Sequence, residues 1–125
     1  MELEEFSDYV NEVLDHEIPP VLLEGLNLGV IVSPRIEYSD EGSQFIVMGH
    51  YVKSRIGKQI ILYYGSFLHF YQGKSTKAWK RKILATIKHE LTHHIEALAG
   101  QEDLAKKEHY EVFLRKQKKK KQKKL

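Results

Sequence analysis

The chain has 125 residues, 42% of them hydrophobic, and a net charge of +3, which together predict one globular domain with an ordinary apolar core. It has no cysteine, so disulfides and thiolate metal ligands are excluded, and any metal must be held by His, carboxylate or water. No apolar run approaches the ~18 residues of a membrane span, and the acidic start Met1–Phe6 does not resemble a signal peptide, so we expect a cytoplasmic protein without a membrane span.

The first segments predict a helix followed by a turn. Residues 2–17 have the i, i+3, i+4 spacing of an amphipathic helix. Its apolar face consists of Phe6, Tyr9, Val10, Val13 and Leu14. Pro19 and Pro20 end this helix, and residues 21–26 are expected to form a short helical turn.

The middle of the chain predicts a small β-sheet. Apolar and β-branched residues are typical of strands at 28–33, 45–53 and 59–64. The polar stretch 37–43 is predicted to be a loop, and the turn at 54–58, centred on Gly57, joins the second and third strands into a hairpin. The aromatic stretch 67–71 fits either a helix or a strand.

The last third predicts two helices. A long one runs over about 77–99, after the breaker Gly73 and an N-cap candidate at 75–76, and Gly100 is placed to terminate it. A final helix is expected over 103–116. The fold class is therefore α+β: an N-terminal helix, a three- to four-stranded sheet, a long helix packed on one side of that sheet, and a C-terminal helix, all within one domain of residues 1–116.

The long helix contains an H-E-x-x-H motif, His89-Glu90-Leu91-Thr92-His93. Positions i and i+4 lie about 40° apart around a helix axis, so the two imidazoles can bind one metal ion. Zinc lowers the pKa of a bound water toward ~7, and the glutamate can then accept its proton during attack on a carbonyl. The alternative interpretation is a solvated polar face that carries two incidental histidines.

Helical geometry separates the motif from the core. The apolar residues Ile83, Leu84, Ile87, Leu91, Ile95 and Leu98 form one stripe of this helix. His89, His93 and Glu96 share the opposite face, and Glu90 lies at the boundary between the two faces. This pattern is typical of a buried helix with a separate metal-binding face.

The motif, with Gly100 and Asp103 following it, resembles the small bacterial zincin-like metallopeptidase family. The residues at 18–20, 30–32 and 61–65 occur in the order expected for that family, and the resemblance covers about residues 4–115. It implies a minimal zincin fold, a zinc site with His89 and His93 as ligands, Glu90 as general base, and hydrolysis of peptide bonds.

The resemblance leaves two alternatives for the third metal ligand. Many family members read H-E-x-x-H-x-x-G-x-x-D, with the closing Asp as the implied ligand, whereas here the stretch between His93 and Gly100 is four residues longer. Either the chain turns at Gly100 and brings Asp103 back to the metal, which we favour, or Glu96 leans toward the helix N-terminus and supplies the ligand.

Several other polar residues are expected to be structural. His94 is predicted to be a hydrogen-bonded core residue, and His50 and His69 lack ligand spacing. Tyr63 and Tyr64 are expected to pack across the sheet, with donation to a developing oxyanion as the alternative. We also expect His16 and His109 to lie on the surface and the side chain of Lys82 to be solvated.

Charge is unevenly distributed, because residues 1–75 hold 5 Lys/Arg and 11 Asp/Glu while residues 76–125 hold 15 and 6. Much of the excess is a lysine-rich tail, 117–125, which we expect to be disordered and chiefly solubilising. The alternative for this tail is loose association with RNA or anionic surfaces.

The sequence therefore predicts a zinc-dependent metallopeptidase that acts on a peptide or protein substrate. A non-catalytic zinc-binding adaptor with a basic tail is the alternative, and another hydrolytic reaction on the same metal, such as deacylation, is a third. The sequence carries no signal for an oligomeric state.

Overall fold

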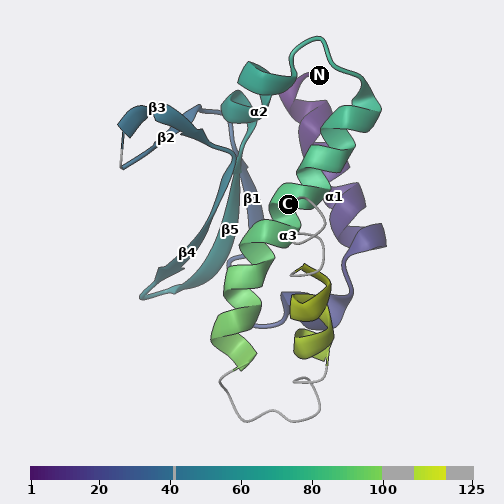
Figure 1. Cartoon of the computed structure of the whole chain (residues 1–125), viewed down its shortest axis with the longest axis vertical. Coiled ribbons are helices and arrows are strands. Elements are labelled where there is room, and N and C mark those ends of the chain that lie inside the picture. Colours follow the sequence, from purple (N-terminus) through teal and green to yellow (C-terminus); the bar gives the residue numbers. More distant parts are fainter. Residues whose placement is uncertain (41, 100–108, 118–125) are drawn as a thin grey trace.

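The computed structural model describes residues 1–40, 42–99 and 109–117 (Figure 1). In chain order the elements are α1 (Leu3–Glu17), the short 3₁₀ helix η1 (Pro20–Leu23), β1 (Val30–Ser33), β2 (Glu37–Ser39), β3 (Gly42–Val47), β4 (Gly49–Ser54), β5 (Gly57–Tyr63), α2 (Tyr64–Tyr71) and α3 (Thr76–Ala99). Residues 109–117 are also helical. The predicted α+β class is confirmed.

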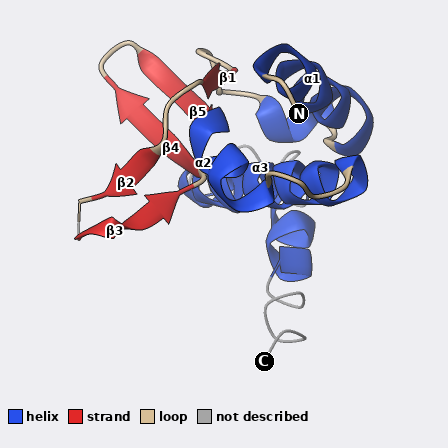
Figure 2. Ribbon diagram, turned by 90° about the horizontal axis from the view of Figure 1, so that it is seen from above, coloured by secondary structure: helices blue, strands red, loops and turns tan. Residues whose placement is uncertain are grey.

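The strands form two separate sheets. In the larger one β5 is central, pairing in parallel with β1 and antiparallel with β4, so that the order is β1-β5-β4. The β4–β5 hairpin is the one predicted, and its turn is held by Asn27, whose side chain accepts from the Lys58 N–H at 2.9 Å and donates to the Ile56 carbonyl at 3.0 Å. The second sheet is the two-stranded β2–β3 hairpin, which projects from the end of the larger sheet (Figure 2).

Two sequence predictions for this region are wrong. The stretch 37–43, predicted to be a loop, contains β2 and the start of β3, and the strand predicted over 45–53 is divided between β3 and β4. The polar composition of 37–43 misled the prediction because these strands are short and carry few apolar residues, and two of the hairpin's aromatic side chains face solvent: Tyr38 is 46% and Phe45 is 56% exposed. The stretch 67–71, which fitted either class, lies in α2.

Helix α3 lies between the larger sheet and α1 (Figure 1). Its N-terminus follows the predicted cap, with the Ala78 N–H donating to Ser75 Oγ at 3.1 Å. The apolar stripe of α3 forms the centre of the core, where Ile83, Ile87, Leu91 and Ile95 are fully buried. The opposite face of α3 is thereby left for the polar residues of the motif.

A glycine sets how closely α3 approaches the sheet. A Cβ atom added to Gly49, the first residue of β4, would lie 3.0 Å from both the Ile61 carbonyl oxygen and Thr86 Cγ2. Only hydrogen fits there without displacement of a neighbour. The start of β4 is therefore in close contact with α3, one turn before the motif.

Candidate metal centre

The motif residues come together on α3 as the spacing predicts. His89 and His93 are exposed, whereas Glu90 is 7% exposed. One ligand atom from each of the three side chains lies within 4.8 Å of the others, and the two imidazole centroids are 5.3 Å apart. Nitrogen and carboxylate donors this close together are what a divalent transition metal prefers, so this group could hold a metal ion.

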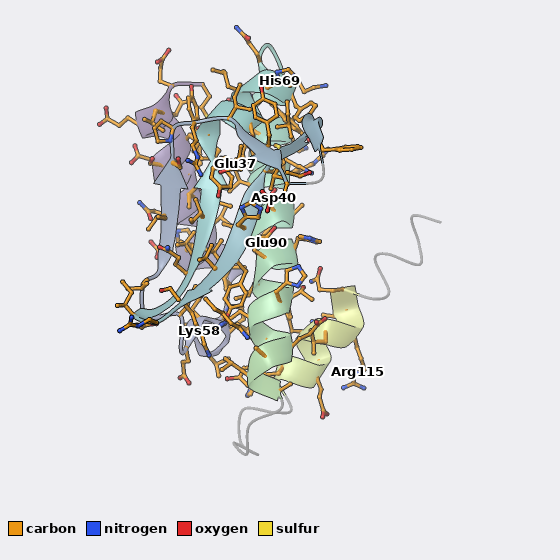
Figure 3. The ribbon with its side chains drawn as sticks, turned by 90° about the vertical axis from the view of Figure 1, so that its left-hand side faces the viewer. Glu37, Asp40, Lys58, His69, Glu90 and Arg115 are labelled. Atoms are coloured by element: carbon orange, nitrogen blue, oxygen red, sulfur yellow. The ribbon has the colours of Figure 1, made fainter. Side chains whose placement is uncertain are left out.

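These three residues line one cleft of about 530 Å³. One wall is α3, which contributes Lys82, Ala85, Thr86, His89, Glu90 and His93. The other wall comes from the end of β3 and the start of β4, and consists of Val47, Met48, Gly49 and His50. In Figure 3, Glu90 lies about halfway along α3 beside the strands.

The surroundings of Glu90 raise the pKa of its carboxyl group. Burial raises the pKa of its carboxyl group to about 7, and a hydrogen bond with the backbone of Tyr51 partly opposes this rise. A carboxylate with such a pKa can both accept and return a proton near neutral pH, as general acid–base catalysis requires. The sequence placed Glu90 at the edge of the polar face, and this edge position is what buries it against β4.

His94 is a core residue, as predicted. It is fully buried, with Nε2 2.8 Å from the Glu24 carbonyl oxygen and Nδ1 2.9 Å from Tyr51 Oη. Because a carbonyl oxygen can only accept, Nε2 carries the proton and Nδ1 accepts from the tyrosine hydroxyl. Desolvation lowers the pKa of His94, which keeps the ring neutral. Both nitrogens are therefore occupied, and His94 has no lone pair left for a metal.

His50 is the site residue that sequence reasoning missed. It is half-buried on β4 and lines the cleft, and its Nδ1 is 2.9 Å from Tyr63 Oη. Its position 39 residues before His89 provides no spacing signal, because only the pairing of β4 with β5 and the packing of α3 bring the two together. Lys82, expected to be solvated, is half-buried and also lines the cleft.

The two tyrosines differ in their surroundings. Tyr64 is structural, because its ring packs with Phe6 and Trp79 and its hydroxyl donates to the Met1 carbonyl. Tyr63 is 2% exposed and bonds to a residue of the cleft wall. His16, His69 and His109 are exposed.

Of the two candidates for a third ligand, only Glu96 is among the described residues. Glu96 is exposed on α3 and is not among the three clustered donors. Gly100 and Asp103, the first half of the predicted C-terminal helix and most of the predicted tail lie outside the described residues. The preference for Asp103 over Glu96 therefore stays a prediction.

A second cavity, of about 570 Å³, lies between the α1–η1 connection and the helical residues 109–117. Its lining includes Ile18, Pro19, Leu22, Val112 and Phe113. Of the described residues that line it, His109 and Glu17 are the ones with metal-ligating side chains, and they do not form a clustered group. The motif cleft, although slightly smaller, is the one lined by a clustered group of metal-ligating side chains.

Among the described residues, no helix combines the length and the apolar character needed to cross a membrane. No known family model and no curated protein matches the sequence. A solved structure does: a conserved hypothetical protein from Thermo thermophilus is 32% identical, with a TM-score of 0.66 over 79% of this chain and 98% of the other. Because the similarity spans almost all of that protein, the chain belongs to the same family as this conserved hypothetical protein.

Proposed function

We propose that the protein is a zinc-dependent metallopeptidase with a minimal zincin-like fold. The observation that carries the proposal is the grouping of His89, Glu90 and His93 within 4.8 Å of one another in a cleft between α3 and β4. Two imidazoles from successive turns of one helix as zinc ligands, with a carboxylate beside them as general base, are the arrangement that H-E-x-x-H zinc hydrolases use.

Zinc held by His89 and His93 would polarise a substrate carbonyl and make a water molecule more acidic. Glu90 accepts the proton of the attacking water as the water oxygen bonds to the carbonyl carbon. The same carboxyl group then returns a proton to the amine nitrogen as the C–N bond breaks. The Tyr51 backbone holds the Glu90 carboxylate, so the base is oriented before substrate binds.

The wall opposite α3 supports a peptide as substrate. Strand β4 pairs with β5 along one edge only, because it is the last strand of its sheet. An edge strand offers unpaired N–H and C=O groups to an extended chain. A peptide laid along the start of β4 would cross the cleft next to Glu90.

The test compares wild type with E90Q, which preserves the shape of the side chain and removes its basicity. We expect both proteins to contain about one zinc per chain by elemental analysis, and only wild type to cleave a mixed peptide library, with turnover reduced at least ~10³-fold in E90Q. E5Q, which changes an exposed carboxylate on α1, is the control for the loss of a carboxylate outside the proposed site.

Equal cleavage by E90Q and wild type would refute the assigned base. Zinc bound without any turnover by wild type would favour the non-catalytic zinc-binding module instead. Zinc affinities of D103A and E96A distinguish the third ligand: the proposal favours a large loss in D103A, and unchanged zinc binding in that variant would exclude Asp103.

A further inference from the structure

His50 faces the motif from the opposite side of the cleft. It is the second residue of β4, and it lines the same cavity as His89, Glu90 and His93 on α3. Its ring is in edge-to-face contact with the ring of Tyr63, at 5.4 Å between centroids, and its Nδ1 lies 2.9 Å from Tyr63 Oη. One edge of the imidazole is thereby fixed to the sheet.

Tyr63, the hydrogen-bond partner of His50, is itself held in place by neighbouring polar groups. The Tyr63 hydroxyl also interacts with Arg35 and Glu37, which form an ion pair. Burial raises the pKa of this phenol and Glu37 adds to the rise, whereas Arg35 opposes it. Glu37 is fixed in turn, since its backbone N–H donates to the buried Ser66 Oγ at 3.1 Å. Figure 3 shows Glu37 on the same side of the molecule as Glu90 and above it.

This network determines which atom of His50 is available. Nδ1 is used by Tyr63, so Nε2 is the remaining polar atom of the ring. His50 is not one of the clustered donors His89, Glu90 and His93, so its fixed ring is not placed as a metal ligand. Among the described residues, Nε2 of His50 is neither grouped with the clustered donors nor hydrogen-bonded to the sheet, so it is suited to contact a molecule that enters the cleft.

We propose that His50 is a substrate-binding residue whose Nε2–H donates to the carbonyl oxygen under attack, and that Tyr63 is the positioning residue that orients it. The role uses the tautomer in which Tyr63 donates to Nδ1 and Nε2 carries the proton. Donors directed at an oxygen that gains negative charge stabilise the transition state more than the ground state. This inference rests on the proposed function and adds a residue from β4 to it.

The experiment uses the full chain loaded with zinc and acetohydroxamic acid as a small carbonyl-bearing probe of the metal centre. Probe affinity is measured by calorimetry for wild type, H50A, H50Q and Y63F. We expect about tenfold weaker binding in H50A, partial recovery in H50Q, whose amide retains an N–H donor, and an intermediate loss in Y63F. H69A is the matched control, because His69 is exposed on α2 and lies well away from Glu90 in Figure 3.

Three further readouts separate this role from others. Zinc content and affinity should be unchanged in H50A, and the ¹⁵N resonances of the His50 ring should show a protonated Nε2 that shifts when the probe binds. In peptide cleavage, H50A should lower kcat more than it raises KM. If H50A does not fold, H50Q and Y63F carry the comparison.

Probe affinity in H50A equal to wild type would overturn the proposal while leaving the metallopeptidase assignment intact. Loss of zinc from H50A would make His50 a ligand, which also overturns it. A wild-type protein that binds zinc but not the probe rejects the role of His50, whereas one that binds no zinc rejects the proposed function and this inference together.

Discussion

Glu90 and His94 lie one helical turn apart on α3, and both are buried against β4 through Tyr51. The backbone of Tyr51 bonds to Glu90 and its hydroxyl bonds to His94. One strand residue therefore holds a proposed catalytic group and a purely structural one. Their different surroundings lead to two different predictions.

Glu90 should destabilise the metal-free fold at alkaline pH. Its pKa is raised from 4.5 to about 7, so between these values the folded chain retains a proton that the unfolded chain has released. Stability therefore falls as pH rises through this window and stays reduced above it. We expect the free energy of unfolding of E90Q to exceed that of wild type by about 3 kcal/mol at pH 8 and by less than about 1 kcal/mol at pH 5. Urea unfolding with a chelator measures both differences, and a difference independent of pH would contradict this account.

His94 should matter for stability and not for zinc. In H94L the Tyr51 hydroxyl and the Glu24 carbonyl both lose their hydrogen bond to the buried imidazole. The free energy of unfolding should fall by about 2–4 kcal/mol. Zinc affinity of the folded variant should equal that of wild type, and a large loss of zinc affinity would show that His94 acts at the metal after all.

At the scale of elements, the site depends on how closely α3 approaches β4. The hydrogen of Gly49 allows this approach, because a methyl group there would be 3.0 Å from Thr86 Cγ2 and from the Ile61 carbonyl oxygen. This contact sets the distance between the two walls of the cleft, since Gly49 lines one wall and Thr86 lines the other. A local change in packing should therefore affect the whole cleft.

We expect G49A to lower the free energy of unfolding by about 1–3 kcal/mol, because the added methyl group overpacks the contact. T86S removes the methyl group that the new Cβ would meet, so the double variant G49A/T86S should recover part of the loss. A double-mutant cycle by urea unfolding tests the coupling. Additive effects of the two substitutions would show that this contact does not limit the approach of α3.

At the scale of the whole molecule, a bound metal should stabilise the fold. His89 and His93 lie on α3, which packs against the sheet, α1 and η1, so the metal-binding residues belong to the element at the centre of the domain. A ligand that binds only the folded state adds to its stability through mass action.

Zinc at about 100 times its dissociation constant should add about 2.7 kcal/mol and raise Tm by about 10 °C. The rise should disappear in the double variant H89A/H93A and persist in H16A/H69A, which removes two exposed histidines from other helices. Thermal unfolding with and without zinc measures this rise in Tm for each variant. A rise that survives in H89A/H93A would place the zinc elsewhere.

Much of the fold could be predicted because its signals are local. The period of apolar residues identified α1 and α3, Pro19 and Pro20 ended α1, and the glycine-centred turn located the β4–β5 hairpin. The β2–β3 hairpin was missed because its strands are short and residues 37–43 are mostly polar, so the sequence there has no run of alternating apolar residues.

The sequence by itself determined the grouping of His89 and His93, which could hold a metal ion, since residues four apart on a helix must share a face whatever surrounds them. It also determined the burial of the opposite stripe, including His94. Only the tertiary structure decided that Glu90 is buried with a raised pKa and that His50 and Lys82 line the cleft. The reason is physical: desolvation and contacts between distant segments depend on strand register and helix packing, which no local pattern encodes.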